Sequence, residues 1–559
     1  MKKFLQVLMV FLVISISELA SASSGAYLAG RQAISDHNFA TASKFQAKSI
    51  SADPENSKLL EGLMISFIAQ GSVDEAVSIA QVYKGTGRVS QISQMILLTS
   101  MIKNGQTEVF LNFVKNADEI TPILKDLLSA WIRMGFDDEV NANRIFDKIA
   151  KVQGMGQFAN FHRAMSQLAA GKVDQAQKTF DLIHRDETNP TRRSVIYHTK
   201  ILLSQSKFKE AQQLLEKWFG PTFDPEIEQL YVNAVNEQVH PRSLFPNTNI
   251  AVADVFHSIA NLVAKEADPT FTLLYSRLAQ YLDRNHIDST LMTADLLVEL
   301  GQYGLAIKEH EKLSDSQPQF FASELGRAEA LRSSGKEMAA IEVLVELTRQ
   351  YPNSANGFSI LGNHYRRLEA YDKAEVSYGE AIKLYEARGE AGWFLYYVRG
   401  ITRERLDLWS LAEKDFRKAL SLNPNQPQVL NYLGYSLIEK NSNLDEALDM
   451  IERAVKESPD SGYIVDSLGW GYYKLGQYEK AVPNLERAAE LMPVDPIVND
   501  HLGDVYWMVG RKTEAEFQWR RALSFDPEED EIERIKKKLK VGLTQVLMEE
   551  TKGTGSLVK

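Results

Sequence analysis

A short internal repeat is the feature that most constrains how this chain can fold. The segment LGWGYYKLGQYEKA at 468–481 aligns with LGDVYWMVGRKTEA at 502–515, so the numbers of equivalent residues differ by 34. A unit this short cannot bury its hydrophobic face alone, so each copy must stack on the next. The chain is therefore predicted to form an array of similar units, because a single hydrophobic core seldom grows past roughly 250–300 residues.

Small residues recur at fixed positions within each repeat. With Gly469 as the reference, seven of the steps between equivalent positions have this same length. The equivalents are the small residues Gly30, Ala260, Ala294, Ala328, Gly362, Gly400, Gly434 and Gly503, and the larger Met64 and Leu98 near the N-terminus. Two antiparallel helices can approach closely only where side chains are small, so these positions are predicted to mark a helix crossing.

Two further signals follow each reference position. Twelve residues later stands a second small residue, namely Ala42, Ala76, Ala306, Ala340, Ala374, Ala412, Ala481 and Ala515, with Ala447 displaced by one. Twelve residues further stands a proline, at Pro54, Pro318, Pro352, Pro424, Pro459, Pro493 and Pro527. Proline lacks an N–H group and has a restricted φ, so it is expected to end the second helix of each pair.

This pattern resembles the tetratricopeptide repeat family, most closely over residues 287–527. The resemblance implies an all-α fold, a right-handed α-solenoid of about thirteen antiparallel helix pairs. It also implies a concave groove, lined by the first helix of each pair, that holds a segment of another protein. The strings NYLGY, DSLGW and NDHLGD are also similar to long periplasmic or envelope repeat proteins of Gram-negative bacteria.

The same register predicts how the chain is divided. Residues 119–156 drift out of register and are expected to be irregular, and 219–249 carries four prolines and is expected to be a phase break. Phe223, Leu230, Tyr231 and Phe245 predict that this break packs on the array. The predicted segments are a signal peptide (1–22), a degenerate N-terminal array (23–218), the break (219–249), a C-terminal array (250–527) and a capping helix with a tail (528–559).

The first 22 residues are predicted to be a cleaved secretory signal peptide. Two lysines precede the apolar run FLQVLMVFLVISI, and a small-residue segment ends at Ala22. The run is shorter than the roughly 20 residues needed to span a bilayer. The start resembles bacterial signals, which favours a periplasmic location with no membrane span after cleavage. The alternative is an uncleaved N-terminal anchor.

Composition excludes several classes of partner and chemistry. The chain has no cysteine, which removes disulfides and thiolate sites, and its net charge of −11 makes it a poor ligand for nucleic acid. The main basic run is ERIKKKLK at 533–540. It is expected to cap the last repeat with its charges in water, and contact with an anionic membrane surface is the alternative.

Aromatic and charged residues outside the predicted core define a candidate partner-binding groove. At about 100° per residue, the second, fifth, ninth and twelfth positions of a first helix point away from its core face, whereas Tyr472 lies on the core face. The groove is predicted to have a basic end, an aromatic floor and an acidic end. Its residues are Arg366, Arg367, Phe394, Tyr397, Arg405, Asn431, Tyr435, Tyr463, Asp466, Trp470, Tyr473, Asp500, Asp504 and Trp507. The alternative is that these rings only pack between neighbouring repeats.

No catalytic motif accompanies the repeats. The ten histidines form neither HxxxH nor HExxH, and the chain has no GxSxG elbow and no GxxxxGK[ST] phosphate loop. The sequence therefore predicts no enzyme, no cofactor and no metal site.

The predicted function is a non-enzymatic periplasmic scaffold or adaptor. Its groove would hold segments of envelope proteins during assembly of an envelope, secretion, pilus or export complex. The alternative is a solenoid that binds glycans or polysaccharides, because tyrosine and tryptophan rings beside carboxylates also suit sugars.

Overall fold

The structure is a computed structural model that describes residues 24–185, 190–220, 223–241 and 248–554. Within these ranges the chain forms helices and no strand, so the predicted all-α solenoid of antiparallel helix pairs is confirmed. The predicted signal peptide lies outside the described residues. The helices group into two compact units, Met1–Gln350 (unit 1) and Tyr351–Lys559 (unit 2).

Unit 1 begins with a helix over residues 24–35. The helices that follow are α2 (Phe39–Ile50), α3 (Ser57–Ala69), α4 (Val73–Gly85), α5 (Gln91–Lys103), α6 (Thr107–Lys115), α7 (Pro122–Gly135), α8 (Glu139–Ala150), α9 (Gly156–Ala169), α10 (Val173–Arg185), α11 (Arg192–Ser204), α12 (Phe208–Phe219), α13 (Pro225–Val235), α14 (Thr248–Ala251), α15 (Ala253–Val263), α16 (Pro269–Leu282), α17 (Ile287–Glu299), α18 (Tyr303–His310), α19 (Phe320–Ser333) and α20 (Glu337–Gln350).

Unit 2 continues the helix pairs to the end of the described chain. Its helices are α21 (Ala355–Arg367), α22 (Tyr371–Ala387), α23 (Trp393–Arg405), α24 (Trp409–Leu422), α25 (Pro427–Glu439), α26 (Leu444–Glu457), α27 (Gly462–Lys474), α28 (Tyr478–Leu491), α29 (Pro496–Met508), α30 (Lys512–Leu523), α31 (Glu529–Val541) and α32 (Leu543–Thr554).

The reference glycines lie where the two helices of a pair cross. A Cβ atom added to Gly503 would lie 2.5 Å from the ring of Trp519, and one added to Gly400 would lie 2.6 Å from the ring of Phe416. In each pair the second helix therefore presents a large side chain to the glycine. Ala515, the second small position, is fully buried at the same crossing. Small residues are needed here because no space remains for a side chain.

The turn between the two helices of a pair also follows the register. The seventh residue after the reference adopts a left-handed backbone, with φ of +71° at Gly476 and +85° at Gly510. Non-glycine residues adopt the same conformation in other pairs, such as Asp407 at 58° and Asn441 at 51°. This residue ends the first helix and reverses the chain, since a left-handed residue cannot continue a right-handed helix.

The irregularity expected for 119–156 is wrong. Helices α7 and α8 form an ordinary antiparallel pair. Ala130 and Ala142 are both fully buried and stand twelve residues apart, and Asp137 has the left-handed φ (57°) seven residues after Ala130. The crossing thus comes two positions earlier than the regular spacing from Leu98 would place it. The step from Leu98 to this crossing is two residues shorter than the regular repeat. The repeat register shifts by two residues, and the helix pair still forms.

The proline-rich segment packs on the array, as predicted. Helix α13 lies against α11 and α12, with Ile227 and Leu230 buried between them. The ring centroids of Phe223 and Tyr231 lie 4.9 Å apart, and both rings pack against the hydrophobic cluster that contains Ile227 and Leu230. Phe245 lies outside the described residues.

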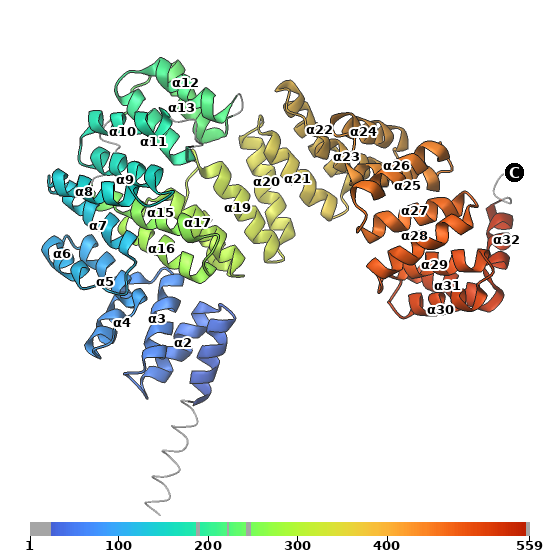
Figure 1. The fold of residues 1–559 in the computed structure, drawn as a ribbon, viewed down its shortest axis with the longest axis horizontal. Coiled ribbons are helices and arrows are strands. Elements are labelled where there is room, and N and C mark those ends of the chain that lie inside the picture. Colours follow the sequence, from blue (N-terminus) through green and yellow to red (C-terminus); the bar gives the residue numbers. More distant parts are fainter. Residues whose placement is uncertain (1–23, 186–189, 221–222, 242–247, 555–559) are drawn as a thin grey trace, which may run out of the picture. The chain divides into compact units, whose positions relative to one another are not determined.

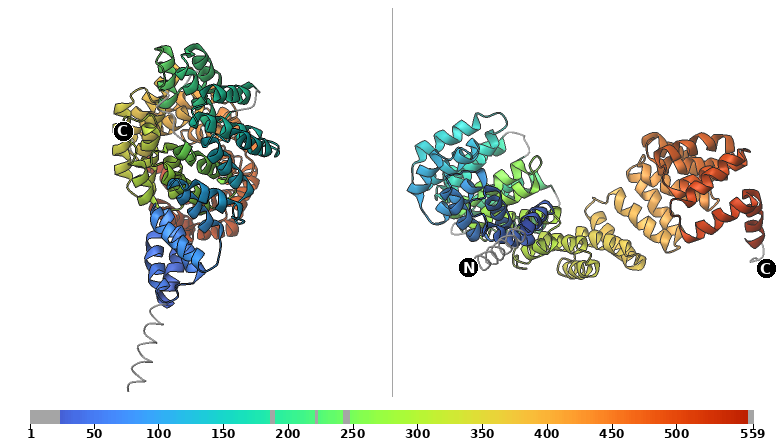
Figure 2. Two further views of the ribbon diagram at one scale, coloured as in Figure 1. Left: turned by 90° about the vertical axis from the view of Figure 1, so that its left-hand side faces the viewer. Right: turned by 90° about the horizontal axis from the view of Figure 1, so that it is seen from below.

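After this segment the chain returns to the first repeats of unit 1. Helices α14, α15 and α16 pack against α3, α5, α7 and α9, and the helices lie together in Figures 1 and 2. The guanidinium of Arg277 donates to the carbonyl oxygen of Ala69 at 2.9 Å, and the Tyr281 hydroxyl donates to Asp74 at 2.6 Å. One hydrophobic core therefore contains residues from both sides of the 219–249 segment. The boundary between the two units lies instead between residues 350 and 351, inside the predicted C-terminal array.

We expect Gly503→Ala to lower the free energy of unfolding by roughly 1–3 kcal/mol, because the added methyl would overlap the Trp519 ring and force the helices apart. Urea unfolding followed by circular dichroism measures the change. Gly379→Ala is the matched control, since its nearest neighbour would be Arg399 at 3.9 Å and alanine favours a helix interior. Equal stabilities of the two variants would contradict the crossing.

Candidate functional site

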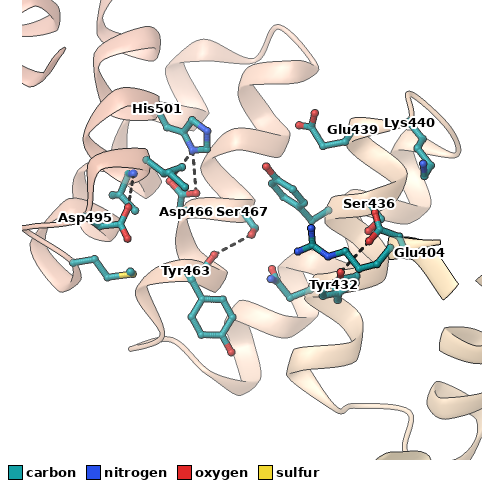
Figure 3. Close-up of a pocket in the computed structure, with 16 residues that line it drawn as sticks. Glu404, Tyr432, Ser436, Glu439, Lys440, Tyr463, Asp466, Ser467, Asp495 and His501 are labelled. Atoms are coloured by element: carbon teal, nitrogen blue, oxygen red, sulfur yellow. Dashed lines mark hydrogen bonds and ion pairs between the residues drawn. The ribbon is translucent and has the colours of Figure 1, made fainter. Parts of the chain in front are cut away.

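Unit 2 contains a cavity of about 540 Å³ along the first helices of four successive pairs (Figure 3). Helices α23, α25, α27 and α29 each contribute residues to its lining. These helices follow one another at the repeat spacing, so equivalent positions form continuous rows along the cavity. We call this cavity the unit 2 groove.

Five of the predicted residues line the unit 2 groove. They are Arg405, Asn431, Tyr435, Tyr463 and Asp466. Tyr463 is the most open of the rings, with 47% of its surface exposed. Burial raises the pKa of the half-buried Tyr435, and the Glu439 and Asp466 carboxylates add to the shift. Its hydroxyl therefore stays protonated at neutral pH and can donate a hydrogen bond.

Asn431 carries a polar atom without a partner. Its side chain lies at the wall of the groove and is 8% exposed, and its Oδ1 atom makes no hydrogen bond within the described part of the chain. A buried acceptor left in this state costs about 1–3 kcal/mol. A donor supplied by a bound molecule would relieve that cost.

The charged side chains around the groove are of both signs. Arg405 and Lys440 are exposed at its edge, and Glu404 and Glu439 stand close to them. Tyr432 donates a hydrogen bond to Glu404 at 3.3 Å, which orients that carboxylate. The mixture suits a ligand that carries both charges more than a polyanion.

Trp470 and Tyr473 do not form an exposed floor, and this part of the prediction is wrong. They are only 8% and 9% exposed. The indole of Trp470 stacks on the rings of Tyr473 and His501, with ring centroids 4.6 Å and 3.8 Å away. Its N–H donates a hydrogen bond of 2.7 Å to the carboxylate of Glu439. The first helices of adjacent pairs pack closely enough for these rings to touch the next helix. The alternative interpretation, packing between repeats, is confirmed for both.

Tyr472, which was assigned to the core, is only partly buried. Its ring packs at the edge of the hydrophobic clusters, and its hydroxyl donates to Glu452 at 2.7 Å. The expected contrast between a core Tyr472 and an exposed Trp470 is therefore reversed. Long tyrosine side chains reach past the core and place the hydroxyl at the surface.

His501 is a groove residue that sequence reasoning missed. Its Nδ1 atom lies 3.0 Å from a carboxylate oxygen of Asp466, and both residues are buried. Burial lowers the pKa of His501, but the facing Asp466 carboxylate outweighs this effect and leaves the pKa above its usual value. His501 belongs to no HxxxH or HExxH motif, and the signal in the sequence is the acid that stands about one repeat length earlier.

The predicted acidic end is occupied by the chain's own C-terminal helix. The ammonium group of Lys538 lies 2.6 Å from both Asp500 and Asp504, and its side chain is fully buried. Arg534 lies 3.7 and 3.6 Å from the same carboxylates. The expectation that all charges of 533–540 stay in water is therefore wrong for Lys538.

Helix α31 thus continues the array in the place of a further first helix, and α32 packs against it. Trp470, Asp504 and Lys538 occupy the same position, the ninth, in three successive repeats. The indole N–H of Trp507 donates to Thr544 in α32 at 3.0 Å, so this ring is also engaged. The ninth position of these three repeats therefore holds tryptophan (Trp470), aspartate (Asp504) and lysine (Lys538) in turn. Each of these side chains packs against a neighbouring helix.

The remaining predicted residues do not line the unit 2 groove. Arg366 donates to the Tyr378 hydroxyl at 3.2 Å, and Arg367 is exposed on the same helix. Phe394 is 47% exposed beside Trp393, and Tyr397 packs against Trp393, Phe416 and Tyr432. These residues lie on α21 and α23.

The sequence pattern of the tetratricopeptide repeat family matches residues 291–355, 397–462 and 467–529. These segments hold the helix pairs of both units in which the register is most regular. These three segments of the chain thus match the tetratricopeptide repeat, and they form antiparallel helix pairs like the rest of the described chain.

Two curated proteins match shorter parts of the chain. A TPR repeat-containing protein of Pseudomonas aeruginosa is 26% identical over 229 residues, which cover 41% of this chain and 32% of that protein. The lipoprotein NlpI homolog of Haemophilus influenzae is 39% identical over 90 residues, which cover 16% of this chain and 27% of that protein. The chain thus spans about a third or less of the length of these relatives.

Solved structures with similar helices cover nearly the whole chain. The crystal structure of the APC/C hetero-tetramer Cut9-Hcn1 has a TM-score of 0.37 at 15% identity and covers 94% of this chain and 98% of its own. Yeast Tom70 has a TM-score of 0.34 at 13% identity and covers 94% and 96%. Both scores are below 0.5, so neither structure bears on how this chain is arranged.

Every helix of the described residues is too short or too polar to pass through a lipid bilayer. The same residues contain no group of three or more histidine or carboxylate side chains placed to hold a metal ion.

We expect Lys538→Met to lower the free energy of unfolding by roughly 3–5 kcal/mol, because the fully buried Asp504 would lose its nearest cation and keep only the more distant Arg534 at 3.6 Å. Urea unfolding at neutral pH measures the loss. Lys536→Met is the control, since that side chain is 59% exposed. Adding Asp504→Asn to Lys538→Met should restore part of the stability. A loss no larger than that of the control would show that the pair is not buried in solution.

The stability contributed by His501 is expected to fall as the pH rises. The folded pKa lies above the unfolded value of about 6.5, so the contribution is complete below that value and disappears as the pH passes the folded pKa. The difference in unfolding free energy between the wild type and the His501→Gln, Asp466→Asn double variant should therefore shrink as the pH is raised from 6 through the folded pKa. A difference between the two proteins that stays constant over this range would contradict the pair.

Proposed function

We propose that this protein is a non-enzymatic periplasmic scaffold that holds an extended segment of an envelope protein in the unit 2 groove. Tetratricopeptide repeats act in protein–protein interaction, which supports the general role. The groove runs along four successive first helices, the surface on which a solenoid of this class presents its concave side.

Asn431 is the observation that carries this proposal. Its unpaired Oδ1 atom needs a donor, and a peptide backbone presents one N–H group per residue at regular spacing. The rings of Tyr435 on α25 and Tyr463 on α27 also line the groove and offer large contact areas with few rotatable bonds. An extended segment could therefore bond to Asn431 while its side chains cover the two rings.

The set of proposed contact residues is smaller than the sequence predicted. Arg405, Asn431, Tyr435, Tyr463 and Asp466 remain as groove residues. Arg366, Arg367, Phe394 and Tyr397 belong to neighbouring first helices of the same unit and are proposed to extend the contact. Trp470, Tyr473, Asp500, Asp504 and Trp507 instead support the groove from within the packing.

The location and pathway are part of the proposal. The predicted signal peptide at 1–22 supports a periplasmic location, with an uncleaved anchor as the alternative. The match to a protein named as a lipoprotein adds support for an envelope role. Partners in assembly of an envelope, secretion, pilus or export complex fit this location.

Tyr463→Ala tests the groove directly. The immobilised protein without residues 1–22 is incubated with a library of random twelve-residue peptides, and the affinities of the selected peptides are measured by calorimetry. We expect the substitution to weaken binding at least tenfold, because loss of a central interface anchor costs about 2 kcal/mol or more. Asn431→Ala should weaken the same peptides.

Phe517→Ala is the matched control, because this ring is 62% exposed on α30 and does not line the groove. It should leave the affinities unchanged. Equal binding by the Tyr463→Ala variant and the wild type would refute the groove. If bacterial polysaccharides, but no peptides, bind in a Tyr463-dependent way, the glycan alternative holds instead.

A further inference from the structure

Unit 1 contains a second and larger cavity, of about 840 Å³. Its walls come from parts of the chain that are far apart in sequence, residues 154–183 and 191–194 at α9–α11 and residues 257–299 in α15–α17. The return of the chain after α13 brings these walls together. Since the cavity is not formed by successive first helices, it is distinct from a groove of the repeat type. We call it the unit 1 cavity.

One part of its wall is apolar. Phe158 and Phe161 on α9, Met292 and Leu296 on α17 and Leu262 on α15 all line it, and Leu262 is 48% exposed. An apolar lining with a few polar groups is the usual composition of a ligand-binding pocket.

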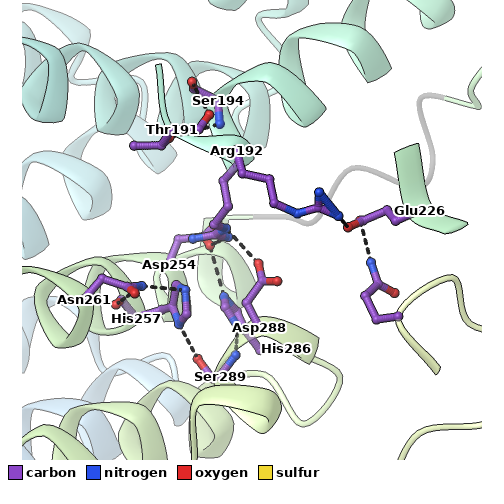
Figure 4. A network of polar contacts seen from close by, with 12 residues as sticks. Thr191, Arg192, Ser194, Glu226, Asp254, His257, Asn261, His286, Asp288 and Ser289 are labelled. Atoms are coloured by element: carbon purple, nitrogen blue, oxygen red, sulfur yellow. Dashed lines mark hydrogen bonds and ion pairs between the residues drawn. The ribbon is translucent and has the colours of Figure 1, made fainter. Parts of the chain in front are cut away.

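A network of polar contacts holds the walls in place (Figure 4). Arg193 on α11 forms ion pairs with Asp254 on α15 and with Asp288 on α17. His286 also contacts Asp254 at 3.0 Å. His257 lies 2.8 Å from Asn261 and 3.2 Å from Ser289. The cavity is therefore built on a fixed frame that joins three helices.

The positive groups around this cavity are already paired. Arg193 is neutralised within the frame, and Arg192 forms ion pairs with Asp224 at 2.9 Å and Glu226 at 2.6 Å. Burial lowers the pKa of His257 to about 3, so this imidazole is neutral at physiological pH. Among the described residues of the wall, none is a cation left free for a bound molecule.

Two carboxylates of the wall have no such partner. Asp295 and Glu299 lie one turn apart on α17, on the face that lines the cavity, and form no ion pair or hydrogen bond within the described residues. Glu299 is the last residue of α17, where the negative end of the macrodipole disfavours an acid. Desolvation by the surrounding protein raises the pKa of Asp295. Both side chains are exposed, so a bound cation can reach them and would be favoured at each.

We propose that the unit 1 cavity binds a basic, apolar peptide segment, with a lysine or arginine paired to Asp295 and Glu299 and an adjacent large apolar side chain against Phe158, Phe161 and Met292. Charge complementarity selects a cation, and the apolar wall selects its neighbour. The volume lies in the upper part of the usual pocket range and accommodates several residues. This second site goes beyond the proposed role of the unit 2 groove.

The test uses the protein without residues 1–22 and two acetylated, amidated peptides. The probe is a fluorescein-labelled LKFLKL, and its partner is LEFLEL, in which glutamate replaces lysine. Fluorescence anisotropy should show saturable binding of the first peptide and at least tenfold weaker binding of the second. The Asp295→Asn, Glu299→Gln double variant should lose at least tenfold in affinity for LKFLKL, while its melting temperature stays equal or rises.

Glu75→Gln with Glu108→Gln is the matched control, because it removes the same charge from exposed residues of α4 and α6 in the same unit. It should retain wild-type affinity. Tyr463→Ala should also retain it, which separates this site from the unit 2 groove.

Three results would overturn the proposal. Unchanged binding by the Asp295→Asn, Glu299→Gln variant would remove the carboxylates from the site. Loss of binding in the Tyr463→Ala variant would place the peptide in the unit 2 groove. Stronger binding of a small organic cation, such as phenethylamine, than of the peptide would make this a small-molecule site.

Discussion

The close crossing of two helices in each pair is the contact on which the rest of this structure depends. At Gly503 and Gly400 the ring of an aromatic residue fills the space that a side chain would need. The small residues therefore set how near the helices lie, and this distance decides which faces remain for the next pair. The first helices of successive pairs then lie close together, so the side chains at their ninth and twelfth positions pack against a neighbouring helix. Trp470 and Tyr473 hold these positions and are buried between repeats.

One helix face consequently serves two purposes in unit 2. Where a neighbouring first helix lies close, the polar residues of this face are satisfied within the chain, as in the contacts of Asp466 with His501 and of Asp504 with Lys538. Where the helices leave space, Asn431 and Tyr463 stay available. The interaction surface of a solenoid thus consists of those residues on this face that do not pack against a neighbouring repeat.

Part of the candidate site could be predicted from the sequence. Helical period placed Arg405, Asn431, Tyr435, Tyr463 and Asp466 on a common face, and all five line the groove. The period could not separate an open ring from one covered by the next helix, because both point in the same direction. The length of each side chain and the distance between helices decide that difference, as the exposures of Tyr463 (47%) and Trp470 (8%) illustrate.

The sequence by itself determined the helices, their pairing and the places where they cross, because these depend on small residues and turns that lie close together along the chain. Even the shifted pair at Ala130 and Ala142 carried that signal. Only the tertiary structure decided that α14–α16 return to α3–α9, and hence that the unit 1 cavity with Asp295 and Glu299 exists. Contacts such as that of Arg277 with Ala69 join residues 208 positions apart, and no local pattern encodes them.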